Sequence, residues 1–249
     1  MPYGICNLSI VPLRLDPSDT SELTSQVLYG EHFKILEQRK SWSKIRLSFD
    51  EYEGWIDNKQ YIEISMDEFT AIEHSKSKLS CNLVEYVQDT NKLLLTIPLG
   101  ASVHAAEFLN HHFEGSYLVE QQSKNKLIDM ALLYLNTPYL WGGKTPFGID
   151  CSGFTQMVYK LCGYTLLRDA SQQATQGEAL SFIEESEPGD LAFFDNAEGH
   201  ITHVGLIMKD NYIIHAHGKV RIDRLDHTGI FNVEKRMHTH KLRVIKKII

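Results

Sequence analysis

The chain has 249 residues, of which 43% are hydrophobic and 23% are charged. These fractions are those of an ordinary globular protein, and the length allows one large domain or two to three small ones. The 25 Lys and Arg residues against 32 Asp and Glu residues give a net charge of −7, and basic residues gather only in short runs such as Lys246-Lys247. Because a nucleic-acid-binding face normally shows as a basic patch, we expect no nucleic-acid partner.

The sequence contains no apolar run of the roughly 18 residues that a transmembrane helix needs. Its first residues lack the basic and apolar regions of a signal peptide, and Pro2 stands where myristoylation requires glycine. We therefore expect no membrane partner and a cytoplasmic location. The four cysteines are too sparse for a disulfide scaffold and form no CxxC pair for a thiolate zinc site.

Short β-prone runs separated by turn residues occupy residues 8–64, a rhythm that predicts a small barrel. The runs lie at residues 8–15, 26–28, 32–37, 42–47 and 53–56. Gly30-Glu31, Trp42-Ser43-Lys44-Ile45 and Gly54-Trp55-Ile56 follow one another in a pattern that resembles the bacterial SH3-like domain. We therefore predict an SH3-like β-barrel over residues 1–64.

Residues 65–120 contain three further runs typical of short strands, Leu93–Pro98, Ser102-Val103 and Tyr117-Leu118-Val119. A turn at Pro98-Leu99-Gly100-Ala101 separates the first two of them. This pattern predicts a second, degenerate SH3-like barrel over residues 65–120.

The last part of the chain, residues 121–249, has helical patterns first and strand patterns afterwards. Apolar residues at helical spacing predict one helix within 121–136, limited by Pro138, and a second that Asp150 opens and Gly163 ends. Strands are expected at residues 191–194, 204–208, 212–216 and 241–249. Helices followed by an antiparallel sheet predict an α+β domain.

Cys151 stands out because it follows Asp150, a good helix N-cap, and so falls in the first turn of the predicted helix. Unpaired backbone N–H groups and the helix dipole favour a thiolate there, and the same N–H groups could stabilise an oxyanion. Cys162 lies at the far end of the same helix and is interpreted as a packing residue.

Two histidines could serve this thiol. If Lys209-Asp210-Asn211 forms a three-residue turn, residue 205 opposes residue 215, and His203 and His215 become diagonal neighbours about 7–8 Å apart. One imidazole could then act as the base and the other could orient it, as in an activated cysteine nucleophile. Cys151, His203 and His215 could instead have packing roles. A zinc site of His203, His215 and His217 is also open, although no HExxH motif supports it. Gly143-Lys144-Thr145 fails as a Walker A motif because Pro138 replaces the required glycine.

The combined series of motifs resembles one family. Pro-Tyr-Leu-Trp-Gly-Gly and Gly-Ile-Asp-Cys-Ser-Gly-Phe lie within 138–154, and Pro188-Gly189-Asp190-Leu191, His203-Val204-Gly205-Leu206 and Ile214-His215-Ala216 follow in order. This series resembles the NlpC-type (NlpC/p60) papain-like cell-wall peptidases over residues 121–249. The resemblance implies Cys151 as nucleophile, His203 as general base, His215 as its orienter and Tyr139 near the oxyanion site, with no metal and no cofactor.

Arg168-Asp169-Ala170-Ser171-Gln172-Gln173 resembles a pocket segment of one branch, the γ-D-glutamyl-L-diamino acid endopeptidases with N-terminal SH3-like domains. That resemblance implies cleavage of free murein peptides, L-Ala-γ-D-Glu-diamino acid, during cell-wall recycling. It also implies a pocket for the free amine of L-Ala. The residues that we assign to substrate binding are Glu22, Tyr52, Asp150, Ser152, Asp169, Ala170 and Ser171, although Ala170 stands where a serine is expected.

Three alternatives stay open. In the first, the enzyme hydrolyses intact cell wall and the SH3-like parts are wall-binding modules. In the second, the chain is a binding module without catalytic activity, which would need no Cys/His/His set. In the third, it is an acyltransferase or amidase that uses the same thiol on other substrates. A pocket that requires a free amine would reject intact wall, because there muramic acid acylates the L-Ala. Losing the partner of buried polar groups discriminates by about 10⁴.

Overall fold

The computed structural model describes residues 2–249, which divide into two compact units. One unit runs to Glu120 and includes Trp141–Pro146, and the other comprises Gln121–Leu140 and Phe147–Ile249. The finer division into domains at 1–64, 65–120 and 121–249 stays a prediction.

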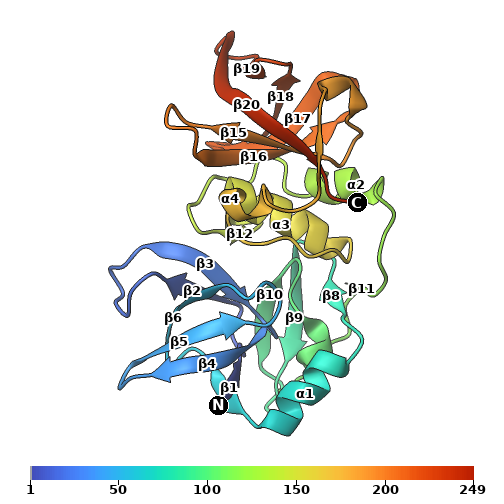
Figure 1. Cartoon of the computed structure of the whole chain (residues 1–249). Coiled ribbons are helices and arrows are strands. Elements are labelled where there is room, and N and C mark those ends of the chain that lie inside the picture. The colour runs from blue at the N-terminus through green and yellow to red at the C-terminus, as the bar shows by residue number, and fades with distance from the viewer. Residues whose placement is uncertain (1) are drawn as a thin grey trace. The chain divides into compact units, whose positions relative to one another are not determined.

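The first unit begins with a seven-stranded antiparallel sheet in the order β3-β2-β6-β5-β4-β1-β7 (Figure 1). Its apolar side chains alternate along the strands and meet in one core that includes Val11, Phe33 and Ile45. All five strands predicted between residues 8 and 56 are confirmed. The strands are β1 (Tyr3–Ile5), β2 (Ile10–Arg14), β3 (Leu23–Leu28), β4 (His32–Gln38), β5 (Trp42–Leu47), β6 (Glu53–Asp57) and β7 (Ile62–Ile64).

The remainder of this unit contains one helix and two separate pairs of strands. Helix α1 (Met66–His74) begins at a capping box in which Ser65 and Glu68 satisfy each other's backbone N–H groups. The other elements are β8 (Leu79–Ser80), β9 (Val84–Gln88), β10 (Leu94–Pro98), η1 (Val103–Ala105) and β11 (Tyr117–Leu118). The strand predicted at Ser102-Val103 is wrong, because Ser102 precedes the 3-10 helix η1. The second SH3-like barrel stays a prediction.

The second unit places helices before a large antiparallel sheet, as the sequence predicts. The helices are α2 (Lys126–Leu132), α3 (Cys151–Leu161), α4 (Ala170–Gln173) and the 3-10 helices η2 (Ile183–Glu185) and η3 (Lys209–Asn211). The strands are β13 (Gly148–Ile149), β14 (Glu178–Leu180), β15 (Leu191–Asp195), β16 (Ile201–Met208), β17 (Tyr212–His217), β18 (Lys219–Leu225), β19 (Gly229–Asn232) and β20 (Met237–Lys247), and β12 (Lys144–Thr145) falls in the first unit.

Strands β15 to β20 close into a ring, because each pairs with the next and β20 pairs back with β15. Helices α3 and α4 pack against strand β16 of this sheet (Figure 1). Every residue of α3 is buried, so that helix is the central packing element of the unit. Gly163 ends it with a φ of +82°, and a Cβ there would lie 2.9 Å from the Gln121 Cα.

Within residues 2–249, no helix has both the length and the apolar character that crossing a membrane requires.

Candidate active site

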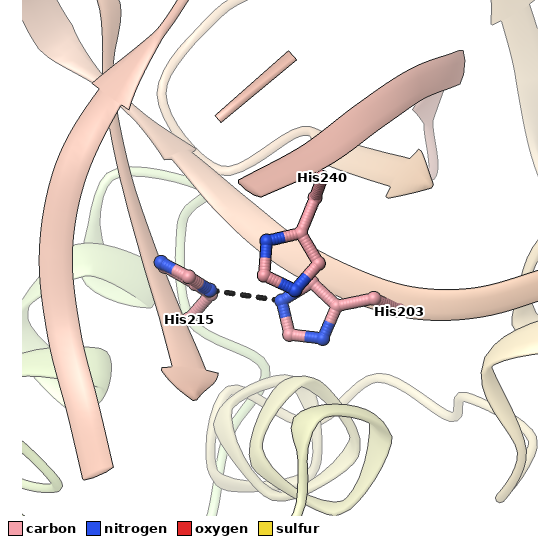
Figure 2. A group of neighbouring side chains, drawn as sticks. All are labelled: His203, His215 and His240. Carbon is pink, nitrogen blue, oxygen red and sulfur yellow. Dashed lines mark hydrogen bonds between the residues drawn. The ribbon is translucent and has the colours of Figure 1, made fainter. Parts of the chain in front are cut away.

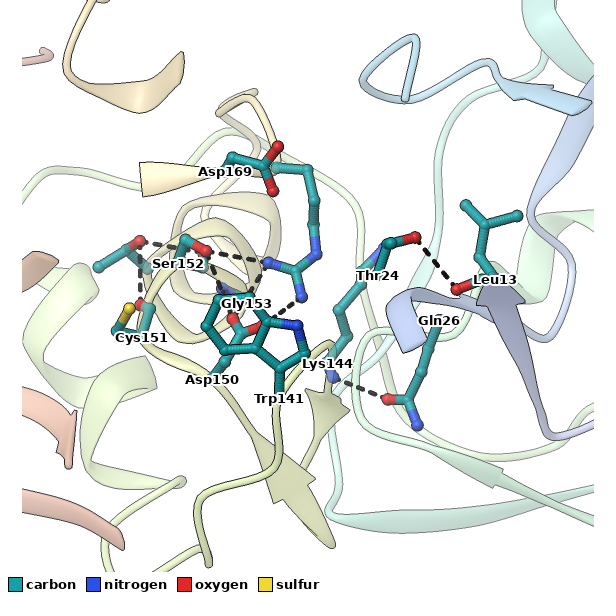
Figure 3. Close-up of polar contacts among 12 residues, drawn as sticks. Leu13, Thr24, Gln26, Trp141, Lys144, Asp150, Cys151, Ser152, Gly153 and Asp169 are labelled. Atoms are coloured by element: carbon teal, nitrogen blue, oxygen red, sulfur yellow. Dashed lines mark hydrogen bonds and ion pairs between the residues drawn. The ribbon is translucent and has the colours of Figure 1, made fainter. Parts of the chain in front are cut away.

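The start of helix α3 is built by the side chain of Asp150. Its carboxylate accepts a hydrogen bond of 2.6 Å from the Gly153 backbone N–H, which is the N-cap interaction that the sequence predicts (Figure 3). Cys151 is therefore the first residue of the helix, and its side chain is only 6% exposed. The nucleophile candidate lies on a rigid, buried element rather than on a mobile loop.

A buried arginine holds the same carboxylate in place. Both terminal nitrogens of Arg168 donate to Asp150, at 3.0 and 2.6 Å, and one of them also donates to the Ser152 hydroxyl at 3.0 Å. This bidentate geometry fixes the loop in front of Cys151. Asp150 and Ser152 are thus engaged in interactions within the unit, and their predicted role in substrate binding stays a prediction.

The surroundings of the Cys151 thiol favour its protonated form, whereas its position in the helix favours a thiolate. Burial raises the pKa of Cys151 to about 12, and the neighbouring Asp150 carboxylate raises it further. Hydrogen bonds from the Val204 and Ser152 backbone N–H groups and the charge of Arg168 lower the pKa, but by less. A base must therefore remove the proton when the thiol attacks.

The two histidines lie where the hairpin register predicts. Strands β16 and β17 pair Met208 with Tyr212 and Gly205 with His215, so His203 and His215 are diagonal neighbours. His203 Nε2 and His215 Nδ1 are 2.8 Å apart (Figure 2). Because Val204, the residue after His203, hydrogen-bonds to the Cys151 thiol, strand β16 brings base and nucleophile together.

The hydrogen-bond chain continues to an acid that the sequence did not single out. His215 Nε2 lies 3.1 Å from Asp223 Oδ2, and Arg221 donates to both oxygens of this carboxylate. Burial lowers the pKa of both His203 and His215, so both rings are neutral near pH 7. Arg221 is paired with His215 in the sheet, and Asp223 lies two residues further along β18. A prediction of this strand pairing would have brought Asp223 close to His215.

A third histidine completes the cluster. The His240 ring stacks on His203 with centroids 4.2 Å apart, and one nitrogen from each of His203, His215 and His240 lies within 4.8 Å of the others (Figure 2). His240, rather than the His217 weighed from the sequence, is the third member of this group. The His203–His215 separation of 2.8 Å is that of a hydrogen bond, whereas two nitrogens on one tetrahedral zinc lie about 3.3 Å apart from Zn–N bonds of about 2.05 Å. The rings as they stand form a proton chain.

A pocket of about 330 Å³ opens beside His203 and is also lined by Tyr139, Thr202, His217 and His240. Tyr139 is half-buried and is held by a backbone hydrogen bond from its N–H to the Gly218 carbonyl at 3.0 Å. Burial raises the pKa of the Tyr139 phenol, and the proximity of Cys151 raises it further. A protonated phenol beside the thiol can donate a hydrogen bond to a developing oxyanion.

The predicted pocket segment lies at helix α4 of the same unit. Asp169 precedes this helix, its backbone N–H donates to Gln172 Oε1 at 3.0 Å, and its side chain is half-buried. Ala170 is buried and Ser171 is exposed. Helix α4 packs against β16, the strand that carries His203.

The two candidates from the barrel lie in the first unit. Glu22 is exposed just before β3, and its carboxylate accepts a hydrogen bond of 2.6 Å from the Trp141 indole N–H. Tyr52 is half-buried between β5 and β6 and packs against the barrel core. Lys144 of this unit is held through its backbone N–H by Gln26 Oε1 at 2.7 Å (Figure 3).

A buried cysteine at the start of a helix, packed on an antiparallel sheet that carries two hydrogen-bonded histidines, defines a papain-like cysteine peptidase. The NlpC/P60 family model matches residues 136–239, and the bacterial dipeptidyl-peptidase SH3 domain matches residues 13–60. Residues 136–239 therefore carry a cysteine peptidase domain of the NlpC/P60 type, and residues 13–60 carry a bacterial SH3 domain.

Relatives with known names match most of the chain. A γ-D-glutamyl-L-lysine dipeptidyl-peptidase of Bacillus cereus is 26% identical over 229 residues, covering 80% of this chain and 68% of the relative. Dipeptidyl-peptidase 6 of Lysinibacillus sphaericus is 24% identical over 248 residues, covering 86% and 88%. The probable endopeptidase p60 of Listeria seeligeri is 38% identical, but over 41% of this chain and 20% of its own.

The fold is shared with a solved structure of an NlpC/P60 family protein from Bacillus cereus. The two superpose with a TM-score of 0.80 at 20% identity, over 99% of each chain. The predicted fold class, an α+β papain-like domain preceded by an SH3-like domain, is confirmed.

Proposed function

We propose that this chain hydrolyses the γ-D-glutamyl–diamino acid bond of free murein peptides, L-Ala-γ-D-Glu-L-Lys or the diaminopimelate equivalent. The observation that carries the proposal is the His203–His215 hydrogen bond on a sheet whose residue Val204 hydrogen-bonds to the Cys151 thiol. The relatives of this domain are named γ-D-glutamyl-L-lysine dipeptidyl-peptidases. The first of those relatives matches 80% of this chain, whereas the p60 endopeptidase of Listeria seeligeri matches 41% of it.

The reaction follows from the neutral resting state. His203 removes the proton from the Cys151 thiol as the sulfur attacks the γ-carbonyl carbon, and His215 supports the imidazolium that forms. The Cys151 backbone N–H and the Tyr139 hydroxyl donate to the oxyanion. The imidazolium then gives its proton to the leaving amine of the diamino acid, and water, activated by the same imidazole, hydrolyses the thioester.

The proposal includes recognition of the free amine of L-Ala by two acids, Glu22 and Asp169, with Tyr52, Ala170 and Ser171 as further contacts. A cationic amine that is taken out of water needs charged partners, because an isolated buried charge is costly. Intact wall offers no such amine, since its L-Ala is acylated. We accordingly propose action on free peptides in the cytoplasm, as part of cell-wall recycling.

The test compares L-Ala-γ-D-Glu-L-Lys with its N-acetylated form, with products identified by mass spectrometry. We expect wild-type enzyme to release L-Ala-D-Glu and lysine from the free peptide and to leave the acetylated peptide intact. Equal cleavage of both would contradict the amine pocket and favour a hydrolase of intact wall. Cleavage of neither would contradict the substrate class.

The acids are tested by Glu22→Gln and Asp169→Asn. Each substitution should lower kcat/KM for the free peptide. The ratio of kcat/KM for the free peptide to kcat/KM for the acetylated peptide should therefore decrease. The matched control is Glu63→Gln, because Glu63 is also an exposed barrel glutamate that accepts one hydrogen bond from a neutral side chain, Gln38, at 2.7 Å. A ratio that changes as much in the control as in Glu22→Gln would remove Glu22 from the pocket.

A further inference from the structure

A buried acid lies behind the two histidines, and the reaction described above leaves it without a role. Asp223 on strand β18 is 1% exposed, and its Oδ2 lies 3.1 Å from His215 Nε2. The other ring nitrogen of His215 contacts His203. Asp223 therefore ends a series of hydrogen bonds that begins at His203 on β16 and passes through His215 on β17 to β18. The residue after His203, Val204, hydrogen-bonds to the catalytic thiol.

The surroundings of Asp223 keep it ionised. Arg221 donates from Nε to Oδ2 at 2.7 Å and from a terminal nitrogen to Oδ1 at 3.0 Å, and the Val233 backbone N–H donates to Oδ1 at 3.3 Å. Burial alone would raise the pKa of Asp223, but the hydrogen bonds from His215 and Arg221 outweigh it and hold the pKa at about 2. Near pH 7 this group is a carboxylate, which can only accept hydrogen bonds.

An acceptor at this position decides where every proton in the chain lies. Because Asp223 cannot donate, His215 must carry its proton on Nε2, and a neutral ring then has a lone pair on Nδ1. His203 must in turn donate from Nε2 to that lone pair, across the 2.8 Å contact. The lone pair of the neutral His203 ring is then on Nδ1, the nitrogen that does not contact His215 (Figure 2).

We propose that Asp223, held by Arg221, is a positioning residue that fixes the tautomers of both histidines and so presents His203 Nδ1 as the proton acceptor for Cys151. This inference rests on the proposed roles of Cys151, His203 and His215. When His203 takes the thiol proton, the positive charge is stabilised through His215 by the same carboxylate.

Other titratable groups lie near the His203–His215–Asp223 series of hydrogen bonds, but none occupies the position of Asp223. The His217 ring lies parallel to His215 at 6.2 Å between centroids, and the His240 ring is edge-on to it at 5.7 Å. Glu234 is exposed and binds Arg221 at 3.0 Å rather than either histidine of the chain. A purely structural reading of Asp223 would make it the anchor of Arg221 on β18, with no influence on ring protons.

The direct test reads the protons themselves. Side-chain ¹⁵N NMR of the full chain near pH 7, with His203→Gln and His215→Gln used only to assign the two rings, reports which nitrogen of each carries hydrogen. We expect Nε2–H and a bare Nδ1 on both rings. A proton on Nδ1 of His215, or on Nδ1 of His203, would overturn the proposal whatever the enzyme's activity.

The functional test is Asp223→Asn, which keeps the shape but lets an amide N–H face His215 Nε2. In a Ser-His-Asp triad the same change costs about 10⁴ in kcat through the wrong tautomer. We expect kcat to fall by about 10²–10⁴ with KM within a few-fold, the two rings to change tautomer in the NMR spectrum, and Asp223→Glu to recover part of the loss. A folded Asp223→Asn enzyme with wild-type kcat, or with lost kcat but unchanged tautomers, would contradict the proposal.

The matched control is Asp226→Asn. Asp226 follows β18 and binds His238 Nε2 at 2.9 Å, but this pair is exposed and lies outside the chain to Cys151. We expect its kcat to stay within about two-fold of wild type, since exposed pairs contribute little. Should Asp223→Asn fail to fold, the wild-type NMR measurement still decides the proposal, because it requires no variant at Asp223. A loss of kcat in Asp226→Asn equal to that in Asp223→Asn would show a general effect of sheet stability and would contradict the specific role.

Discussion

His203 and His215 are in hydrogen-bond contact, with Nε2 and Nδ1 2.8 Å apart, although the strand register pairs His215 with Gly205 and not with His203. The contact is diagonal, and it depends on the missing side chain at Gly205. A Cβ at that position would lie 2.9 Å from the His215 Cβ and 2.7 Å from the Ile213 Cδ1.

The first prediction is that Gly205→Ala displaces His215 and weakens catalysis. Overpacking of this kind costs typically about 1–3 kcal/mol of folding free energy, and we expect kcat/KM to fall by about ten-fold or more, as for a misplaced catalytic group. Denaturant unfolding and steady-state kinetics measure the two effects. The double variant Gly205→Ala/Ile213→Val serves as the control, because it removes the Ile213 Cδ1 atom at 2.7 Å and keeps the contact with His215. Full recovery of kcat/KM in this double variant would show that His215 had not moved.

The second prediction concerns the ionisation of the nucleophile. Because burial raises the pKa of Cys151 to about 12 and lowers that of His203 well below 6.5, the resting pair is a thiol and a neutral imidazole. Alkylation of Cys151 by a neutral reagent should be slow at neutral pH and should accelerate above pH 9.0, the ordinary pKa of a thiol. Activity should persist through pH 6.5 and be lost only well below it, because the pKa at which His203 becomes protonated is lowered well below 6.5.

The opposite resting state, a thiolate and an imidazolium, would give a different pH dependence of alkylation and activity. A thiolate–imidazolium pair would be alkylated rapidly in mild acid and would lose activity at alkaline pH as the imidazolium deprotonates. Cys151→Ala, labelled in parallel, corrects for reaction at the half-buried Cys81. Rapid alkylation of Cys151 near pH 5 would contradict the neutral resting state.

The sequence predicts the backbone of this site well and its electrostatics poorly. The Asp150 cap and the three-residue turn at 209–211 are local features, and each determines a position, that of Cys151 on α3 and that of His215 opposite Gly205. The helix dipole favours a thiolate at Cys151, but burial, which depends on packing against the whole sheet, raises the pKa of this thiol.

The residues that the sequence missed come from distant strands. His240 on β20 contacts His203, and Asp223 on β18 contacts His215. Both contacts depend on how the strands pair in the folded sheet, which local sequence patterns do not predict. The chain has 12 histidines, so a pair that is close in sequence, such as His215 and His217, is an equally good candidate for membership of the histidine cluster. The strand expected at Ser102-Val103 failed for a similar reason, since a short apolar run fits a strand or a 3-10 turn equally well.

The third prediction concerns the buried pair of Arg168 and Asp150. Arg168→Met leaves the Asp150 carboxylate buried without its cation, and breaking such a pair costs about 3–5 kcal/mol. We expect a loss of this size in the free energy of unfolding of the catalytic unit, measured by denaturant titration. Arg46→Met is the control, because Arg46 is 45% exposed and its pair with Glu53 is worth about 0–1 kcal/mol. Equal losses in both variants would contradict the structural role of Arg168.

The fourth prediction is that the histidine cluster needs no metal and is inhibited by one. Extended treatment with EDTA should leave kcat unchanged, because the 2.8 Å His203–His215 contact carries a proton. Added Zn²⁺ should inhibit reversibly by displacing that proton, with His240 as a third ligand. Loss of activity on chelation and its recovery with Zn²⁺ would contradict a thiol mechanism without metal.

In the proposed mechanism Cys151 forms a thioester with the γ-carboxyl group of D-Glu, and intact-protein mass spectrometry after rapid acid quenching detects such an adduct. With L-Ala-γ-D-Glu-L-Lys as substrate, we expect an adduct of one L-Ala-D-Glu acyl group, mapped to Cys151 in the wild-type enzyme and missing from Cys151→Ala, which should show no turnover. Turnover by Cys151→Ala, or an adduct mapped to another residue, would contradict it.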